Sequence, residues 1–353
     1  MHNHNATHTG WFMPAEWVPH AATWMVWPHN QALWESTWGV SLAEVQTDFA
    51  RVANTIAHFE PVKMVVDPSA VDRARQLCGA NIELVQIAVD DSWCRDSGPS
   101  FVCHPQLGMA GVSWRFNAWG GKSEHGLDEG LARRILNGLG MDCFGTHLSN
   151  EGGAIHVDGE GTLITTESVL LNANRNLGMS KRDIEDVFGR LLGVEKVIWL
   201  PGDPDFVTGD MTDGHVDGVC AFARPAALLV DATRDSTSTY AQVVRENRRA
   251  LELASDARGR RFELIDLFEA SDAVDESAEV FCASYTNFYI CNHAIIMPAY
   301  GIAADQEAAA TLQRAFPDRE IAPVRINQLA HGGGGVHCIT QQQPAWPLVG
   351  GAQ

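Results

Sequence analysis

The stretch NEGGAIHVDGEGTLIT, residues 150–165, sets out a plan that the rest of the chain repeats. A polar start with two glycines leads into a short strand-like run at 154–157. The pair Asp158-Gly159 is a hairpin signal, and a second run with β-branched residues follows it. The stretch therefore predicts a β-hairpin with a polar residue, Glu151, directly before its first strand.

The same local plan recurs at four other places. The polar residues that open the five units stand at 96, 151, 215, 287 and 338, so the intervals are 55, 64, 72 and 51 residues. The units include predicted strands at 100–102, 216–219, 285–290 and 336–340. Helical patterns lie between them at 42–58, 127–139, 181–192, 240–254 and 305–315. Repeated hairpin and helix units predict an α/β fold with a quasi-repeated architecture.

The chain has 353 residues, of which 45% are hydrophobic and 20% charged, values typical of a globular protein. Lysine plus arginine is 25 and aspartate plus glutamate is 44, so the net charge is 25 − 44 = −19. An acidic surface argues against nucleic acid or an anionic membrane as partner and is compatible with a cationic ligand. Because no proline- or glycine-rich linker divides the chain, we predict a flexible head at 1–10 and one domain at 11–353.

The eight cysteines are scattered and include no CxxC pair, so neither a zinc knuckle nor a disulfide scaffold is indicated. The N-terminus lacks the basic and apolar regions of a signal peptide. No apolar run approaches the ~20 residues that span a membrane. We therefore predict a cytoplasmic protein with reduced thiols.

His215 and Asp217 form the first pair of residues with chemical potential. In a strand, residues i and i+2 point to the same face, so the pair predicts a general acid/base unit or a cation site. The alternative is a half-exposed polar strand face.

Cys338 follows His337 and four glycines at 332–335, which let a ligand approach the backbone closely. It is a candidate nucleophile, although an ordinary cytosolic cysteine is more often a small buried residue. Asp96 and Glu151 stand at two other unit starts, where each could instead cap a turn. Together, a thiol, a histidine and several carboxylates favour a guanidinium substrate, because this planar cation pairs bidentately with carboxylates.

Several segments resemble a known family, the agmatine deiminases of the guanidino-group modifying (pentein) superfamily, which also has peptidylarginine-deiminase-like members. The resemblance covers nearly the whole chain and rests on MPAEW at 13–17, WCRD at 93–96, FNAWGG at 116–121, EGG at 151–153, HVDG at 156–159, NRN at 174–176, GHVD at 214–217 and GGGVHCITQQQP at 333–344.

The resemblance implies a five-bladed, pseudo-fivefold α/β propeller of ββαβ units. It implies that agmatine is hydrolysed to N-carbamoylputrescine and ammonia through a covalent cysteine intermediate, with no metal or organic cofactor and with a possible homodimer. The implied catalytic residues are the nucleophile Cys338, the acid/base His215 and the guanidinium-holding carboxylates Asp96 and Asp217. The implied substrate-binding residues are Trp93, Trp119, Glu151 and Gly335.

The chain departs from the family pattern just before His215. Family members commonly have an acidic residue four positions before the histidine and Asn two positions before it, where this chain has Met211 and Asp213. We expect Asp210 and Asp213 to contact the far end of the substrate.

Other functions stay open. The site could act on arginine, a guanidino acid or peptidyl arginine, or transfer the amidino group to an amine. A non-catalytic guanidine-binding protein and a metal site of His331, His337 and Cys338 are further alternatives. The last is disfavoured because neighbouring residues of a strand point to opposite faces.

Overall fold

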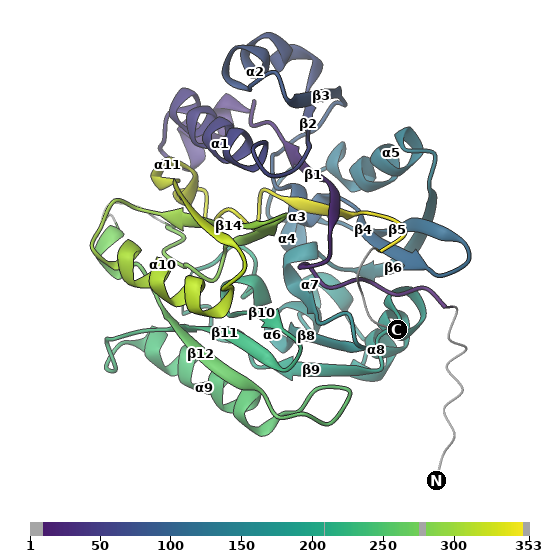
Figure 1. Cartoon of the computed structure of the whole chain (residues 1–353), viewed down its shortest axis with the longest axis vertical. Helices are drawn as coiled ribbons and strands as arrows, with labels where there is room; N and C mark the ends of the chain where they lie inside the picture. Colours follow the sequence, from purple (N-terminus) through teal and green to yellow (C-terminus); the bar gives the residue numbers. More distant parts are fainter. Residues whose placement is uncertain (1–9, 208, 275–279, 349–353) are drawn as a thin grey trace.

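The computed structural model describes residues 10–207, 209–274 and 280–348, which form five small sheets around a common centre, with the longer helices outside them (Figure 1). Nearly all of the head predicted at residues 1–10 falls outside the described residues. The single domain over 11–353 stays a prediction.

Four sheets share one construction, in which a hairpin of two antiparallel strands leads through a helix to a third strand parallel to the second. Their elements are β4 (Ser100–His104), β5 (Gly108–Arg115), α5 (Leu131–Gly138) and β6 (Asp142–Ser149); β7 (Ile155–Val157), β8 (Thr162–Thr166), α8 (Lys181–Leu192) and β9 (Lys196–Leu200); β10 (Cys220–Arg224), β11 (Ala227–Ala232), α9 (Thr239–Leu253) and β12 (Glu263–Phe268); and β13 (Tyr289–Cys291), β14 (Ala294–Ala299), α10 (Ala304–Ala315) and β15 (Glu320–Arg325).

The fifth sheet joins the two ends of the chain. Strand β16 (Gln341–Pro344) pairs antiparallel with β1 (His20–Val26), and α1 (Leu42–Ile56) then leads to β2 (Val62–Val66), parallel to β1. Helix α2 (Val71–Leu77) adds a fourth strand, β3 (Ile82–Gln86). This pairing completes the fifth ββαβ unit, so the predicted five-bladed α/β propeller is confirmed.

Shorter helical segments connect these elements. They are η1 (Ala32–Thr37), η2 (Pro68–Ala70), α3 (Cys94–Ser97), α4 (Ala118–Gly121), η3 (Asp128–Gly130), η4 (Gly152–Ala154), α6 (Glu167–Leu170), α7 (Ala173–Asn176), η5 (Val216–Gly218), η6 (Ser271–Ala273) and α11 (Asn327–Ala330).

The five predicted helices are confirmed, with ends that shift by a few residues at most. Helix α8 illustrates why they form: Ser180 and Asp183 make a reciprocal capping box at its start, and Gly193 ends it in the left-handed conformation with φ 68°. Its buried residues Ile184 and Phe188 are one turn apart, and they anchor the helix to its sheet.

Three predicted strands begin too early. Residues 216–218 form the 3₁₀ segment η5, and residues 336–339 form turns. In the unit that contains Asn287, the strand begins at Tyr289 instead of residue 285. Val216 and Val336 are buried, but within turns near the centre of the ring, where the neighbouring glycines let the chain bend. The polar residues of these units therefore precede the strands instead of lying on them.

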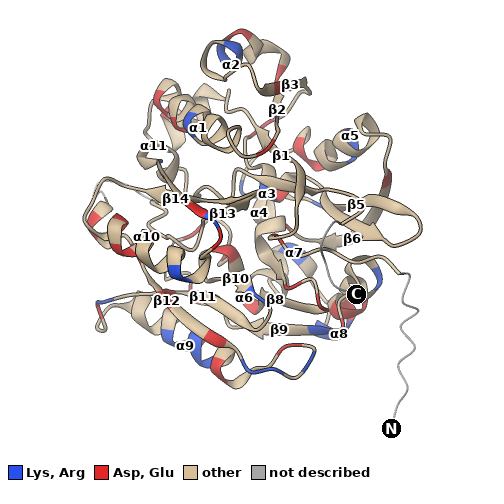
Figure 2. Ribbon diagram, in the orientation of Figure 1, with Lys and Arg blue, Asp and Glu red and all other residues tan. Residues whose placement is uncertain are grey.

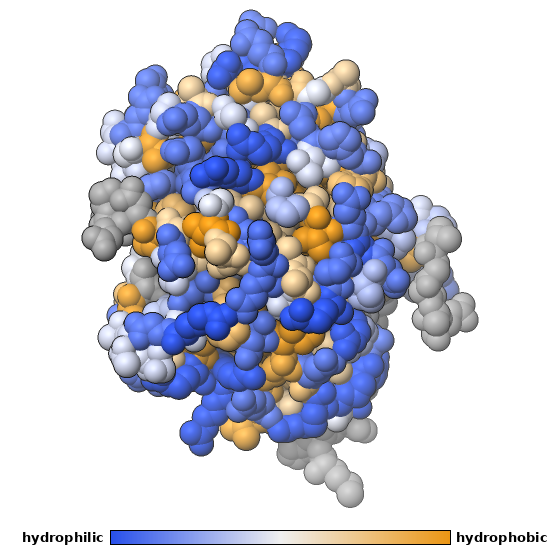
Figure 3. Space-filling model, turned by 60° about the vertical axis from the view of Figure 1, so that its left-hand side comes forward, coloured by the Kyte–Doolittle hydropathy of each residue, from blue (hydrophilic) through white to orange (hydrophobic). Residues whose placement is uncertain are grey.

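The outside of the molecule is polar. The outer helix α9 carries charges of both signs (Figure 2). On the face shown in Figure 3, hydrophilic side chains predominate and apolar ones form small patches. Within the described ranges, no helix is both long and apolar enough to cross a membrane.

Candidate active site

Each of the five units carries a polar side chain just before its first strand. Asp96 lies in α3 before β4, Glu151 before β7, His215 before β10, Asn287 before β13 and Cys338 before β16. Because the units surround one centre, residues that are 51 to 72 positions apart along the chain meet there. The contacts below connect all five.

A cavity of about 360 Å³ reaches this centre. Cys338, His215, Asp217 and Asn287 lie in its wall. Five carboxylate residues line it, and its described lining includes no lysine or arginine; the acidic residues are Asp203, Asp210, Asp217, Asp231 and Glu269. The cavity therefore suits a cation.

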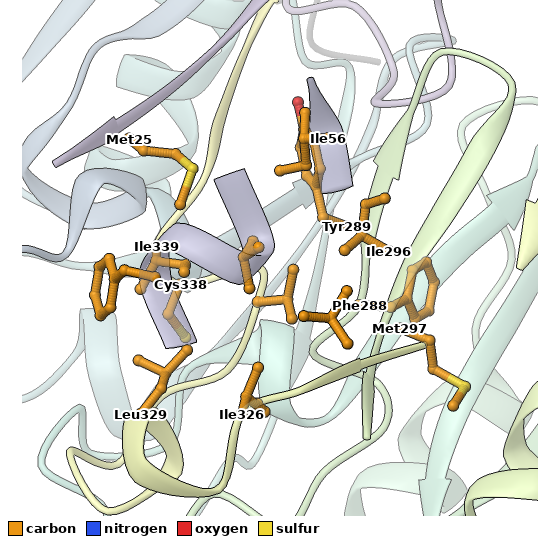
Figure 4. Packing of buried hydrophobic residues seen from close by; sticks show 14 of the residues in the cluster. Met25, Ile56, Phe288, Tyr289, Ile296, Met297, Ile326, Leu329, Cys338 and Ile339 are labelled. Carbon is orange, nitrogen blue, oxygen red and sulfur yellow. The ribbon is translucent and has the colours of Figure 1, made fainter. Parts of the chain in front are cut away.

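Cys338 is held between polar and apolar neighbours. Its Sγ accepts a hydrogen bond from Nδ2 of Asn287 at 3.2 Å and lies 3.7 Å from Oδ2 of Asp217. On its other side it belongs to an apolar cluster with Leu329 and Ile339 (Figure 4). Burial, reinforced by the charge of Asp217, raises the pKa of the thiol well above its usual value. The thiol is therefore protonated at neutral pH in the substrate-free site.

His215 lies between two carboxylates. Its Nε2 is 3.3 Å from Oε2 of Glu151, and its Nδ1 is 3.8 Å from Oδ1 of Asp96. Burial by itself lowers the pKa of the imidazole, but the charges of Asp96 and Glu151 outweigh it and raise the pKa to about 9. His215 is therefore a cation at neutral pH, able to donate a proton.

Asp96 is oriented by two donors. Its Oδ1 accepts from the backbone N–H of Gly153 at 2.9 Å, and its Oδ2 accepts from Nε1 of Trp119 at 2.9 Å. A Cβ atom on Gly153 would lie 2.6 Å from Nδ1 of His215 and 2.9 Å from Oδ2 of Asp217. Only glycine leaves room there for the three side chains to meet.

Asp217 continues into a buried chain of charges. Its Oδ2 lies 2.9 Å from Nδ1 of His337, and Nε2 of the same ring lies 2.9 Å from Oε1 of Glu16. Arg95 donates to Glu16 at 3.2 Å. Burial would raise the pKa of Asp217, but the hydrogen bond and charge of His337 lower it below its usual value. Asp217 is therefore ionised.

Four polar residues contact this centre although the sequence alone predicts no role for them in it: Asn287, Glu16, Arg95 and His337. Signals existed: Asn287 opens the fourth unit, and Glu16 and Arg95 lie within the MPAEW and WCRD motifs. For His337 the sequence suggests only a metal-ligand alternative. The sequence carries no signal for the pairing of these side chains across the ring.

The residues expected at the far end of the substrate have different surroundings. Asp213 does not line the cavity; it pairs with Arg175 and with Lys122, each at 2.5 Å. Asp210 does line the cavity and accepts from the backbone N–H of Thr212 at 2.9 Å. Asp213 is thus already neutralised by protein cations.

Trp93 and Gly335 support the site from outside the cavity wall. The ring centroid of Trp93 is 5.9 Å from that of Trp34, and a Cβ on Gly334 would lie 2.2 Å from the Trp93 ring. A Cβ on Gly335 would lie 2.6 Å from Oδ1 of Asn287. The glycine run thus permits close packing against both side chains.

A buried group of Glu16, His156 and His337 has ligand atoms within 4.8 Å of one another, the separation a metal site needs. Arg95 already supplies a positive charge to Glu16, and both nitrogens of His337 face carboxylates. This environment fits an ion-paired network better than a metal. Within the described ranges, His331, His337 and Cys338 do not form such a group, and His331 packs its ring on Phe281.

A cysteine–histidine–carboxylate centre inside five ββαβ blades defines an enzyme of the pentein superfamily. A family model described as Porphyromonas-type peptidyl-arginine deiminase matches residues 12–344, and the chain belongs to that family.

Its relatives include proteins with a named activity. The chain is 41% identical to agmatine deiminase of Stutzerimonas stutzeri over 367 residues, covering 96% of this chain and 97% of the relative. Agmatine deiminase of Pseudomonas aeruginosa (strain LESB58) is 41% identical over 362 residues, 95% of this chain and 96% of the relative. The solved structure of agmatine deiminase of Enterococcus faecalis matches with a TM-score of 0.89 at 33% identity, covering 95% of this chain and 96% of that one.

Proposed function

We propose that the protein hydrolyses agmatine to N-carbamoylputrescine and ammonia. The observation that carries the proposal is the cavity, whose wall contains Cys338, His215 and Asp217 together with further carboxylates. Among the described residues of that wall there is no lysine or arginine. Agmatine is cationic at both ends. Arginine and guanidino acids carry a carboxylate, for which this wall offers repulsion instead of a partner. The activity of the named relatives supports the same substrate.

The first half-reaction begins with the grip on the guanidinium by Asp96 and Asp217. Hydrogen bonds to charged groups contribute about 1.5–3 kcal/mol each. The incoming positive charge lowers the pKa of the neighbouring Cys338 thiol, which releases its proton to solvent as the substrate enters. The thiolate adds to the guanidinium carbon and forms a tetrahedral intermediate. The His215 imidazolium then protonates the departing nitrogen, the C–N bond breaks and ammonia leaves.

The second half-reaction hydrolyses the covalent amidino-thioether. Neutral His215 takes a proton from water, and the resulting hydroxide adds to the same carbon. The second tetrahedral species loses its hydroxyl proton to solvent and collapses with cleavage of the C–S bond, which regenerates the thiolate and leaves a ureido product. The proton taken from water leaves His215 protonated for the next turnover, and Asp96 and Glu151 stabilise that state because they raise its pKa to about 9.

A screen of guanidino compounds with ammonia detection tests this function. We expect agmatine to give the highest kcat/KM, above arginine, a guanidino acid and a peptidyl arginine, without an added acceptor amine. Dependence on such an amine would instead indicate an amidinotransferase. Cys338→Ser should abolish ammonia release, whereas Cys78→Ser, a half-buried free cysteine outside the cavity, should keep it. Binding of agmatine with no ammonia release by the unaltered protein would contradict the proposal.

We also place the enzyme in the cytoplasm, where its eight cysteines, all free thiols in the structure, would stay reduced. The homodimer stays a prediction.

A further inference from the structure

Asp231 is a buried carboxylate in the cavity wall beside the catalytic turn. It lies near the end of β11, and its backbone N–H donates to the carbonyl of Val219 at 2.9 Å. That bond attaches Asp231 to the residue that directly follows η5, and η5 is the segment that carries Asp217. Both carboxylates line the same cavity.

The hydrogen-bond partners of Asp231 are neutral. The Tyr240 hydroxyl donates to Oδ2, and the Ser284 hydroxyl donates to Oδ1 at 3.3 Å. In the described part of the chain, no Lys, Arg or His is paired with Asp231, although only 4% of the residue is exposed. By contrast, Glu16, Glu151 and Asp213 each pair with an arginine.

A buried carboxylate without a cation is costly when ionised. Burial, with repulsion from Glu269, raises the pKa of Asp231 to about 8. In the empty cavity Asp231 is therefore largely neutral at pH 7. A cation entering the cavity would favour the carboxylate form and supply the missing partner.

The reaction centre lies in the same cavity, whose wall His215, Asp217 and Cys338 share with Asp231. In the loop before His215, Met211 is apolar and Asp213 is already neutralised by Arg175 and Lys122, so Asp210 is the carboxylate that this loop contributes to the cavity wall. Asp231 is therefore a carboxylate of the cavity wall that has no cationic partner among the described residues.

We propose that Asp231 is a specificity-determining residue that receives the ammonium at the far end of the substrate. The enzyme would then select guanidines that carry a second positive charge over guanidines with an apolar tail. This inference rests on the proposed deiminase reaction, and it adds the group that recognises the tail. Ser284 and Tyr240 orient the carboxylate, and the ammonium donates to it when the substrate is seated.

The experiment compares two substrates, agmatine and n-butylguanidine, which share the guanidinium and differ in the terminal ammonium. We expect Asp231→Asn to lower kcat/KM for agmatine by thirtyfold or more, about 2 kcal/mol. For n-butylguanidine the change should stay below threefold. The agmatine preference of the unaltered enzyme should nearly disappear in the variant.

Asp128→Asn is the matched control. Asp128 is likewise buried, and it accepts hydrogen bonds from the backbone N–H groups of Asp90 and Asp91. Burial raises its pKa to about 7, and it does not line the cavity. Its substitution should leave the ratio of the two kcat/KM values unchanged. Asn is isosteric with the neutral form of Asp231, and thermal denaturation checks that the Asp231→Asn variant is folded. If that variant does not fold, Asp231→Ser replaces it in the same comparison.

Equal losses with both substrates in the Asp231 variant would overturn the inference and leave the deiminase function standing. Selective loss in Asp210→Asn, with Asp231→Asn unaffected, would assign the ammonium contact to Asp210 and would also overturn it. If the unaltered enzyme releases ammonia from neither compound, the proposed function itself fails.

Discussion

Asn287 brackets Cys338 with both ends of its side-chain amide. Nδ2 donates to Sγ at 3.2 Å, and Oδ1 accepts from the backbone N–H of Cys338 at 3.2 Å. One side chain thus orients the cysteine backbone and supplies a hydrogen-bond donor to its sulfur. A donor at this position stabilises a thiolate that the nearby carboxylates disfavour.

Replacing Asn287 with Asp should reduce kcat by a hundredfold or more, about 2.7 kcal/mol. The substitution exchanges the N–H donor for an anion near the sulfur, which raises the pKa of Cys338 further. The pH dependence of Cys338 alkylation by iodoacetamide measures that pKa directly. An unchanged alkylation profile would show that Asn287 does not stabilise the thiolate.

Asp217→Asn should slow the reaction by orders of magnitude, because an amide cannot pair ionically with the guanidinium. Steady-state kinetics with agmatine provide the measurement, and circular dichroism checks the fold. A change below about threefold, worth under ~0.7 kcal/mol, is the result that would show Asp217 does not grip the cation.

The activity should decline as the pH rises through about 9, where His215 loses its proton. The folded pKa of His215 is raised above the ~6.5 of an unfolded histidine. Its contribution to stability is therefore fully present below pH ~6.5 and is lost as the pH rises through about 9. Glu151→Gln removes one of the two carboxylates and should shift the alkaline limb of kcat/KM to lower pH. A limb that stays in place would mean another group sets it.

Glu16→Gln should lower the free energy of unfolding by about 3–5 kcal/mol, as expected when one partner of a buried ion pair is removed. Glu16 compensates the charges of Arg95 and His337, all of them buried. Urea denaturation provides the measurement.

Glu60→Gln is the comparison for that variant, because Glu60 and His20 also form a buried pair, at 3.1 Å, outside the cavity. Both variants should lose stability. Only Glu16→Gln should also change the activity of the folded fraction, since His337 connects Glu16 to Asp217. Equal activities in the two folded variants would show that the network acts on stability alone.

Much of the architecture could be predicted from local pattern. Helix α8 begins at its capping box and ends at a left-handed glycine, both visible in the sequence. The hairpin of β7 and β8 turns at Asp158-Gly159 as predicted. The strands expected around Val216 and Val336 were wrong because a short apolar run in a buried turn has the same composition as a short buried strand.

The amino-acid sequence by itself determined the repeat, and with it the five polar residues that open the units, since turn and hairpin chemistry is local. Only the tertiary structure decided which side chains meet. Asn287 donates a hydrogen bond to Cys338, His337 lies between Asp217 and Glu16, and Asp213 forms an ion pair with Arg175. These pairings span up to 321 positions and depend on ring closure by β16 on β1. Contacts of that range are set by the packing of whole blades, for which no short stretch of residues carries a signal.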